Sequence, residues 1–547
     1  MTPEHRIETF RADYDSASAC AARFLCDIHP ADRIAFTIVD SYLSGRDVTY
    51  GELADQSRRF AAALTDLGVG PGDRVATLMG KSLELVVALL GIWRCGAVHV
   101  PLFTAFAEST AVARVRTCGA KVIVCDMAQR PKLASVTASR VIVAAEVNEY
   151  ERPHGSDLIF AELQRSYRPE DATTFVGGGD AVLVQLYTSG TTGLPKGVPL
   201  PIKALAAIRT YVEYGLDVHR DDVYWNAADT GWGYGLFYGL LGPLTAGMSN
   251  LLLRSSFSPE LTWRVMSRYQ VTNFAAAPTV FRALRGCPSP SGERLALRRL
   301  SSAGEPLTAD VVEWSRKTFG VEVRDHYGQT EHGMVIVNGW HPDVRGPLKP
   351  GSMGQPMPGW TTSVLWPDRD EIAPPGTPGR IAIDVPGSPL FWFPGYVDAP
   401  EATAERFSED GRWYYTGDVG CLDDDGYCFF SARDDDVIIM AGYRIGPFEV
   451  ESALTTHPDV SEAVVVGVPD NLRGEVVEAF VVPRPGVAPS DALAADLKLL
   501  VKQTYAAHAY PRKVHFLPEL PKGPSGKIQR SLLRTRRREQ LAGSGGA

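Results

Sequence analysis

The chain has 547 residues, and because one packed core rarely exceeds about 200 residues, we expect more than one packed unit. Hydrophobic residues make up 45% and charged residues 22%, the composition of an ordinary soluble globular protein. The formal net charge of −9 at pH 7 argues against a general nucleic-acid-binding protein, whose surface would be basic.

Membrane insertion, secretion and a disulfide framework are not expected either. The sequence contains no uncharged apolar stretch of about 20 residues, the length that spans a bilayer. Its first residues, Met1 to Arg6, lack the basic-then-apolar order of a secretory signal. The eight cysteines are scattered without a Cys-x-x-Cys pair, so we expect reduced packing residues in a cytoplasmic protein and neither zinc nor disulfides.

Helical and strand patterns alternate from residue 50 onward. The predicted elements are helix Tyr50–Leu67, strand Asp73–Met79, helix Ser82–Cys95, strand Ala97–Pro101, helix Ser109–Thr117, strand Lys121–Val124, strand Ala181–Tyr187, helix Pro201–Tyr214, strand Asp222–Trp225, helix Pro259–Tyr269, strand Val271–Ala276, strand Leu297–Ser301 and a segment from Val321 to Glu331. Strands separated by helices favour a parallel sheet covered on both faces, so the predicted fold class is α/β.

The pattern changes after residue 346. Short runs rich in Pro and Gly, from Gly346 to Gly395, predict β-rich structure such as a distorted barrel. A compact βαβ-like unit then begins at Val437, with a helix at Pro447–His457 and a strand at Ala463–Gly467. A basic helix near the C-terminus completes the chain.

A loop rich in Ser, Thr and Gly follows the apolar run Ala181–Tyr187. It reads Thr188-Ser189-Gly190-Thr191-Thr192-Gly193-Leu194-Pro195-Lys196-Gly197. Glycines let backbone N–H groups crowd together, hydroxyls add donors and the lysine adds positive charge, so the loop is suited to polyphosphate. No Gly-Lys-Ser/Thr closes it, which sets it apart from the P-loop NTPase pattern. The alternative, a surface loop of the same composition, is disfavoured by the length of the pattern.

Six stretches, in one order, carry a resemblance to a known family. They are Thr188–Lys196, Ala303–Leu307, Asp325–Glu331, Tyr414–Asp418, Arg433–Arg444 and Pro521–Lys527. On these motifs the chain, from about Phe36 to Arg534, resembles the adenylate-forming superfamily of acyl-CoA synthetases, luciferases and peptide-synthetase adenylation domains. The resemblance implies a large N-terminal domain (1–434) of parallel αβαβα-type sheets plus a distorted β-barrel. A small mobile α+β domain (435–547) would follow.

The resemblance implies that a carboxylate attacks the α-phosphate of ATP and pyrophosphate leaves. Two anions must meet, so the site needs positive charge and donors where charge develops. Lys527 would bridge carboxylate and α-phosphate during adenylation, Thr330 would bond the α-phosphate, and Glu331 with Thr191 would hold Mg²⁺. The residues expected to bind ATP or AMP are Thr188, Ser189, Gly190, Thr191, Thr192, Gly193, Lys196, Gly304, Glu305, Pro306, Asp325, His326, Tyr327, Gly328, Gln329, Thr330, Asp418, Arg433 and Arg444.

Within that set, Gly304 to Pro306 would form an adenine slot on which Tyr327 stacks, and Asp418, helped by Arg433, would accept the ribose hydroxyls. Alternatives exist for single residues. Glu331 taken alone would be a solvated helix acid and Lys527 a surface lysine, but their place in the shared motifs favours function.

A second half-reaction is implied, in which the CoA thiolate attacks the acyl-adenylate after the small domain rotates. Asp435 occupies the matching hinge position. Gly442 and Tyr443 would line the pantetheine tunnel, and Arg444 would meet phosphate groups. A glycine in a β-turn is commonplace, which is the alternative for Gly442.

The predicted acyl pocket rests on small residues. Ala228–Trp232, with Gly96–His99, resembles the acetyl- and medium-chain acyl-CoA synthetases most. Acetyl-specific members close the pocket with a tryptophan where this chain has Gly328, and with a valine where it has Gly233. Together with Ala303, these residues imply an acid larger than propionate, whether medium-chain, branched, aromatic or polycyclic. The remaining pocket residues are Trp232 and Tyr234; Tyr234, with Phe237 and Tyr238, could line the pocket or pack a core helix.

The sequence therefore predicts an ATP- and Mg²⁺-dependent acid:CoA ligase, with a carboxylic acid, ATP and CoA as its small-molecule partners. One alternative loads the phosphopantetheine of a separate carrier protein, since the chain after Lys527 is too short for a fused carrier domain. The other is a non-catalytic AMP-binding sensor, which the filled catalytic positions disfavour. The oligomeric state, monomer or dimer, stays open.

Overall fold

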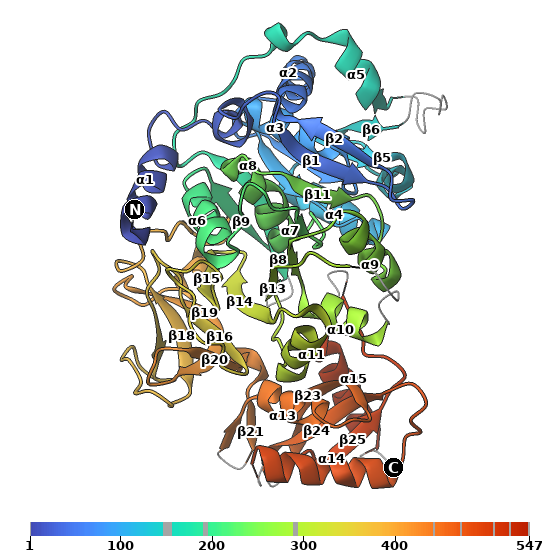
Figure 1. Cartoon of the computed structure of the whole chain (residues 1–547), viewed down its shortest axis with the longest axis vertical. Coiled ribbons are helices and arrows are strands. Elements are labelled where there is room, and N and C mark those ends of the chain that lie inside the picture. The colour runs from blue at the N-terminus through green and yellow to red at the C-terminus, as the bar shows by residue number, and fades with distance from the viewer. Residues whose placement is uncertain are drawn as a thin grey trace.

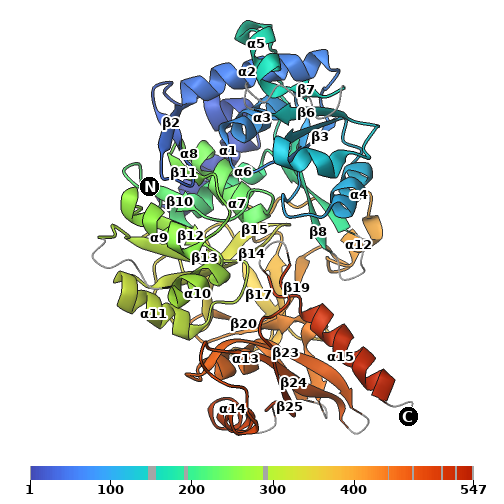
Figure 2. The same cartoon turned by 90° about the vertical axis from the view of Figure 1, so that its right-hand side faces the viewer.

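A computed structural model describes residues 2–145, 156–189, 195–287, 294–440, 443–470, 473–506, 509–523 and 527–544. Figures 1 and 2 show a large α/β part, coloured blue to yellow, and a smaller C-terminal domain, coloured orange to red, below it. None of the described helices is long and apolar enough to span a bilayer.

The first sheet has seven strands and is parallel except for one edge hairpin, β8–β9. Its order is β7 (Leu158–Ile159), β6 (Arg140–Ala144), β5 (Val122–Asp126), β3 (Arg74–Leu78), β4 (Val98–Pro101), β8 (Val182–Ser189) and β9 (Pro195–Pro201).

The second sheet has thirteen strands, and its parallel half joins an antiparallel half at β14–β15. Its order is β17 (Thr362–Leu365), β18 (Gly379–Asp384), β19 (Trp413–Leu422), β20 (Cys428–Arg433), β16 (Ser352–Pro356), β15 (Gly333–Val337), β14 (Val323–Gln329), β13 (Arg299–Ala303), β12 (Asn273–Ala276), β10 (Tyr224–Asn226), β11 (Asn250–Leu253), β1 (Ile34–Val39) and β2 (Gly45–Thr49).

Helices cover both outer faces of the two sheets and fill the space between them. Every residue of α3 from Leu85 to Arg94 is buried, which its apolar sequence permits, and the largest core joins α3 and α6 to strands of both sheets. The helices α9 to α11 pack on the second sheet, and α4 packs on the first. The helices of this part are α1 (Pro3–Tyr14), α2 (Tyr50–Asp66), α3 (Leu83–Arg94), α4 (Glu108–Cys118), α5 (Phe160–Ser166), α6 (Ala204–Thr210), α7 (Gly233–Leu236), α8 (Gly242–Ala246), α9 (Pro259–Arg268), α10 (Pro278–Gly286), α11 (Ala309–Phe319) and α12 (Pro400–Ala404).

The C-terminal domain packs three helices around a five-stranded sheet with its own apolar core, which runs from Ile438 to Leu533. Its elements are β21 (Ile438–Met440), β22 (Tyr443–Ile445), α13 (Pro447–Thr455), β23 (Val460–Asp470), β24 (Gly474–Pro483), α14 (Asp491–Thr504), β25 (Lys513–Phe516) and α15 (Arg530–Ser544).

The predicted α/β class and the layered arrangement are confirmed, and elements between residues 50 and 126 agree within a residue or two. Three details differ. The helix expected from Pro201 starts at Ala204, because β9 continues to Pro201. The strand expected at Ala463–Gly467 extends over Val460–Asp470, because it pairs along its length with β24. Among the described residues the antiparallel strands of the region predicted as a distorted barrel are hydrogen-bonded to the second sheet and continue its strand order to β17.

The packing of α2 against α3 depends on a glycine. A Cβ atom at Gly91 would lie 2.8 Å from the Phe60 ring and 3.3 Å from the Ser57 carbonyl oxygen. Gly91→Ala should therefore lower the free energy of unfolding by about 1–3 kcal/mol, because overpacking a tight helix contact forces side chains from their rotamers. Gly286→Ala is the matched control, since nothing lies within 4 Å of its Cβ position. Equal urea midpoints for both variants would contradict the packing argument.

Candidate active site

Two predicted motifs meet where parallel strands of the second sheet end. β13 ends at Ala303 and β14 at Gln329, so the segments that follow these neighbouring strands, Gly304–Pro306 and Thr330–Glu331, start at one edge of the second sheet. Ligands of open α/β sheets bind at such carboxyl ends. The short helix α7, which begins at Gly233, lies against this edge, because a Cβ atom at Gly233 would be 3.6 Å from the Thr330 hydroxyl oxygen.

Lys527 of the C-terminal domain contacts this edge. Its ammonium nitrogen lies 5.2 Å from the centre of the Trp232 ring, within cation–π range. Gly304 lies beside the same ring: its φ is +98°, and a Cβ atom would be 2.5 Å from Trp232 ring atoms. Lys527 keeps accessible surface, but the protein that surrounds it partly removes its ammonium from water and lowers its pKa, against the opposing charge of Glu305.

Asp418 is the most completely enclosed acid of the set, with 3% of its surface exposed. Its Oδ2 accepts hydrogen bonds from the Tyr327 hydroxyl and, at 2.7 Å, from Gln329 Nε2. Arg433 Nε lies 3.2 Å from Oδ1, yet among the described residues no donor makes a hydrogen bond to that oxygen. Burial raises the pKa of Asp418, and Arg433 counteracts this. An Oδ1 without a hydrogen-bond donor fits a ligand hydroxyl group, as expected for ribose.

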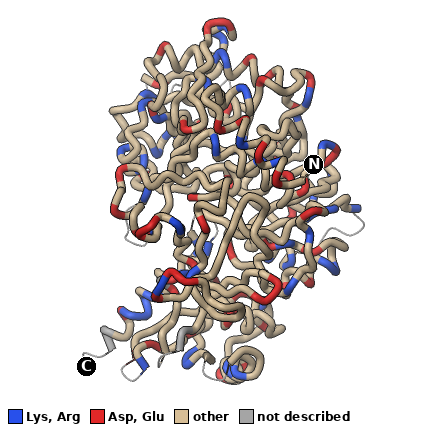
Figure 3. The backbone as a smooth tube through the Cα atoms, turned by 90° about the vertical axis from the view of Figure 1, so that its left-hand side faces the viewer, with Lys and Arg blue, Asp and Glu red and all other residues tan. Residues whose placement is uncertain are grey.

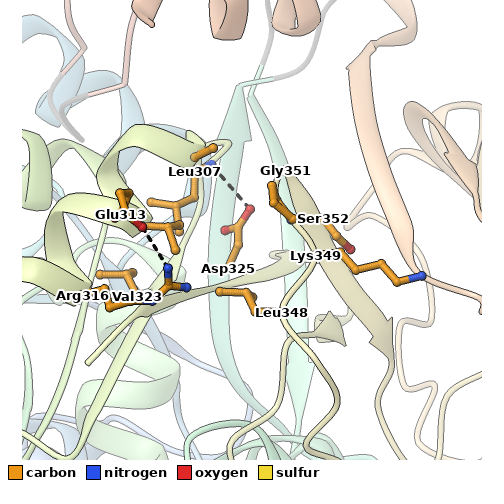
Figure 4. A pocket seen from close by; sticks show the side chains of 12 residues that line it. Leu307, Glu313, Arg316, Val323, Asp325, Leu348, Lys349, Gly351 and Ser352 are labelled. Carbon is orange, nitrogen blue, oxygen red and sulfur yellow. Dashed lines mark hydrogen bonds and ion pairs between the residues drawn. The ribbon is translucent and has the colours of Figure 1, made fainter. Parts of the chain in front are cut away.

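A cavity of about 90 Å³ lies beside the predicted adenine slot, between α11 and the segment before β16. In Figure 4 the Asp325 carboxyl group lies at its centre and bonds toward Leu307, whereas the Lys349 amine points away. The Leu307 N–H donates to Asp325 Oδ2 at 3.4 Å, and burial holds the pKa of this carboxyl well above its usual range. Asp325 therefore presents a polar group to an otherwise largely apolar recess.

The His326 side chain turns into the core, so the predicted contact with ATP could be made only by its backbone. It is 1% exposed, its Nδ1 lies 2.7 Å from the Tyr211 hydroxyl, and its Nε2 lies 3.3 Å from the Asn338 carbonyl oxygen. Side chains alternate along a strand, so a residue between Asp325 and Tyr327 faces the opposite way. Burial lowers the pKa of His326 to about 3, so the ring is neutral and belongs to the core.

Gly328 has a different role from the one predicted. A Cβ atom there would lie 2.2 Å from the carbonyl oxygen of Gly333, the first residue of β15. The register of β14 with β15 shifts between Tyr327 and Gly328. The missing side chain is therefore required by a close backbone approach and is no measure of pocket depth. A tryptophan at this position would have to displace β15 before it could narrow any pocket.

Unlike Gly328, Gly233 has room for a Cβ atom. Its Cβ position has ordinary contacts of 3.6 to 3.9 Å with the side chains of Thr330, Phe237 and Leu186. Tyr234 is 3% exposed, and its hydroxyl lies 3.3 Å from that of Tyr211. Tyr234 therefore matches the alternative that it packs in the core, whereas the Phe237 side chain lies next to Gly233.

Several predicted residues cannot be placed. Gly190, Thr191, Thr192, Gly193 and Gly442 lie outside the described residues, as do the side chains of Ser189, Asp435, Tyr443 and Arg444. Thr188 and Lys196 are register partners across β8 and β9, so the predicted phosphate loop connects these two strands. Glu305 is held by Arg282 at 2.6 Å and by the Thr279 hydroxyl at 2.7 Å.

Glu331 has partners that the sequence analysis missed. It is 6% exposed, and its Oε1 accepts a hydrogen bond of 2.9 Å from the Tyr396 hydroxyl, which in turn accepts one of 3.3 Å from Arg406 Nε. The Lys196 ammonium lies 5.2 Å from the centre of the Tyr396 ring. A single buried carboxylate fits Mg²⁺, which proteins usually hold through one or two carboxylates plus substrate phosphates.

A family profile described as "AMP-binding enzyme" matches residues 25–397, and one described as "AMP-binding enzyme C-terminal domain" matches residues 449–527. The chain belongs to the AMP-binding enzyme family.

Relatives narrow the activity within the family. The chain is 36% identical over 499 residues to acetyl-coenzyme A synthetase of Bacillus subtilis, covering 89% of this chain and 84% of that protein. It is 36% identical over 496 residues to acyl-coenzyme A synthetase ACSM3, mitochondrial, of Mus musculus, covering 89% and 83%.

Two solved structures show the same arrangement. An acyl-CoA synthetase of Brucella canis is 40% identical with a TM-score of 0.77, covering 98% of this chain and 97% of that one. The anthranilate CoA ligase AuaEII in complex with anthranoyl-AMP is 27% identical with a TM-score of 0.86, covering 96% and 98%. The chain is therefore an AMP-forming acyl-CoA synthetase, with ATP, CoA and a carboxylic acid as substrates.

The Tyr396 hydroxyl offers a test of how this synthetase holds Glu331. Tyr396→Phe removes the donor to Glu331 and should lower the rate of pyrophosphate release about 10-fold or more, because small displacements of positioning groups are costly. Tyr269→Phe is the control, since its hydroxyl bonds the Leu43 carbonyl oxygen on the hairpin of β1 and β2. Wild-type rates for Tyr396→Phe would show that Glu331 needs no such support.

Proposed function

We propose that this synthetase activates a carboxylic acid larger than propionate and transfers the acyl group from its adenylate to CoA. The acid would be medium-chain, branched, aromatic or polycyclic. The observation that carries the proposal is the room for a Cβ atom at Gly233, which would make only ordinary van der Waals contacts with Thr330, Phe237 and Leu186. Ligases that resemble the chain and are named for anthranilate and benzoate, 27% and 29% identical, support an aromatic or similarly bulky acid.

Adenylation would take place between Trp232, Thr330 and Lys527. Lys527 belongs to the C-terminal domain, so its charge can reach the meeting carboxylate and α-phosphate only while the two domains are closed on each other. Donors and charge placed where a transition state develops charge are worth on the order of 100-fold or more in rate. Mg²⁺ held by Glu331 would neutralise part of the charge on the departing phosphates.

We further propose that the C-terminal domain, residues 435–547, rotates about Asp435 to admit CoA along Gly442 and Tyr443, with Arg444 near its phosphates. An ammonium that leaves the site after adenylation makes room for the thiol.

The cysteines form no disulfide among the described residues, which supports a cytoplasmic enzyme.

The decisive experiment measures AMP formation with ATP and Mg²⁺ across a panel of acids, with and without CoA. Acetate, octanoate, isobutyrate, benzoate and a polycyclic acid span the pocket sizes. We expect CoA-dependent turnover with at least one of the larger acids. Pyrophosphate exchange without conversion to a thioester would instead indicate carrier-protein loading, and AMP binding without pyrophosphate release would indicate a sensor.

Gly233→Val tests the pocket itself. The added methyl groups would occupy the space next to Phe237, so kcat/KM for the preferred larger acid should fall about 10-fold or more relative to acetate, the range that one or two methylene groups command. Gly70→Val is the control, since nothing lies within 4 Å of its Cβ position. Gly70 also precedes Pro71, which already favours the extended backbone conformation that valine adopts. An unchanged preference would exclude Gly233 from the pocket.

A further inference from the structure

Four charged side chains connect the predicted hinge to the segment that carries Lys527. Asp436, directly after Asp435, pairs through its Oδ2 with Arg530 Nη1 at 3.0 Å and through its Oδ1 with Arg534 Nη2. Glu451 of α13 pairs with the other terminal nitrogen of Arg530 at 2.6 Å. We call these four residues, Asp436, Glu451, Arg530 and Arg534, the ion-pair cluster.

The cluster is largely removed from solvent. Its side chains are between 12% and 23% exposed, and Arg530 Nε also donates to the Val465 carbonyl oxygen at 3.1 Å. Glu451 Oε1 accepts a further bond of 2.7 Å from the Val465 N–H. In Figure 3 the helix that leads to the C-terminus carries several basic segments, drawn in blue. Such a cluster fixes positions more than it adds stability, since each partly exposed pair is worth about 0–1 kcal/mol.

Lys527 lies close to this fixed point. It precedes Arg530 by three residues, a span of about 10 Å at full extension. The chain around it forms a hairpin, in which Gly523 N–H donates to the Lys527 carbonyl oxygen at 2.7 Å and Gln529 N–H to the Pro521 carbonyl oxygen at 2.8 Å. The base of the hairpin is thus held by its own backbone bonds and by the arginine that follows it.

We propose that the ion-pair cluster positions Lys527 by making the first turn after the hinge and the Lys527 hairpin move as one rigid unit. All four members lie on the C-terminal side of Asp435, so the cluster persists whichever way the domain is turned. Lys527 then moves together with the first turn after the hinge when the domain rotates. The four residues are positioning residues, because they are proposed to act through Lys527 and not on the substrates. The inference rests on the adenylation role proposed for Lys527.

Arg534→Gln is the most selective variant, because Asp436 keeps Arg530 as a partner and no buried acid is left unpaired. We expect the single-turnover rate of adenylation to fall about 10- to 100-fold, because misplacing a reacting group by about 1 Å has costs of this size. KM for ATP should stay within about twofold, since the loss is confined to the transition state. Thioester formation from a chemically prepared acyl-adenylate and CoA should be nearly unchanged.

Two further variants sharpen the result. Arg534→Lys keeps the charge and should restore most of the adenylation rate. Arg538→Gln makes the same change of charge four residues farther along α15, on an exposed residue, and should behave as wild type. Adenylation by Arg534→Gln at the wild-type rate would overturn the inference. So would proportional loss of both half-reactions with a lowered thermal midpoint, which is the result expected of a purely structural role.

The inference and the proposed function fail in different ways. Wild-type protein that releases no pyrophosphate with any acid would overturn the proposed function, and the positioning role with it. Active wild-type protein whose Lys527→Ala variant adenylates normally would remove the lysine from the reaction and leave nothing for the cluster to position. Loss of adenylation in Lys527→Ala together with a normal Arg534→Gln variant would overturn the cluster alone.

Discussion

The contact of the Lys527 ammonium with the Trp232 ring joins two parts of the chain that have separate apolar cores. Two anions have to approach each other in the reaction of this family, and a cation reduces the repulsion between them. Because the cation belongs to the smaller domain, the charge can be supplied at one stage and withdrawn at another. Gly304 lies so close to the ring that a Cβ atom there would be 2.5 Å from ring atoms, so no side chain fits between them.

Three buried acids at the site are stabilised in three different ways. Asp418 is paired with Arg433 and keeps one oxygen without a hydrogen-bond donor among the described residues. Glu331 accepts a hydrogen bond from the Tyr396 hydroxyl. Asp325 has only a long backbone hydrogen bond among the described residues, and burial strongly raises its pKa. Each buried charge that lacks a full set of partners costs free energy of folding. Such acids are typical of ligand sites, where the ligand completes the hydrogen bonding that the protein leaves open.

Much of this could be predicted from sequence, because the α/β alternation and the motif segments are local patterns. Asp418, Tyr327 and Gln329 stand in such motifs, and they do come together. The sequence could not show that His326 turns into the core, which depends on strand alternation and on Tyr211 far away in the chain. Tyr396 and Arg406 were missed because no spacing relates them to Glu331, 65 residues from Tyr396. Gly328 was misinterpreted because a tight backbone approach and an open pocket both select glycine.

The pairing of β19 with β20 places Asp418 directly opposite Arg433, two residues before the predicted hinge. A ribose hydroxyl that bonds Asp418 Oδ1 shares the oxygen nearest to the Arg433 guanidinium. On the roles proposed above, a bound nucleotide would contact the strand pair that leads directly into the small domain. Nucleotide binding and the proposed hinge would then be neighbours in the fold, with no long path between them.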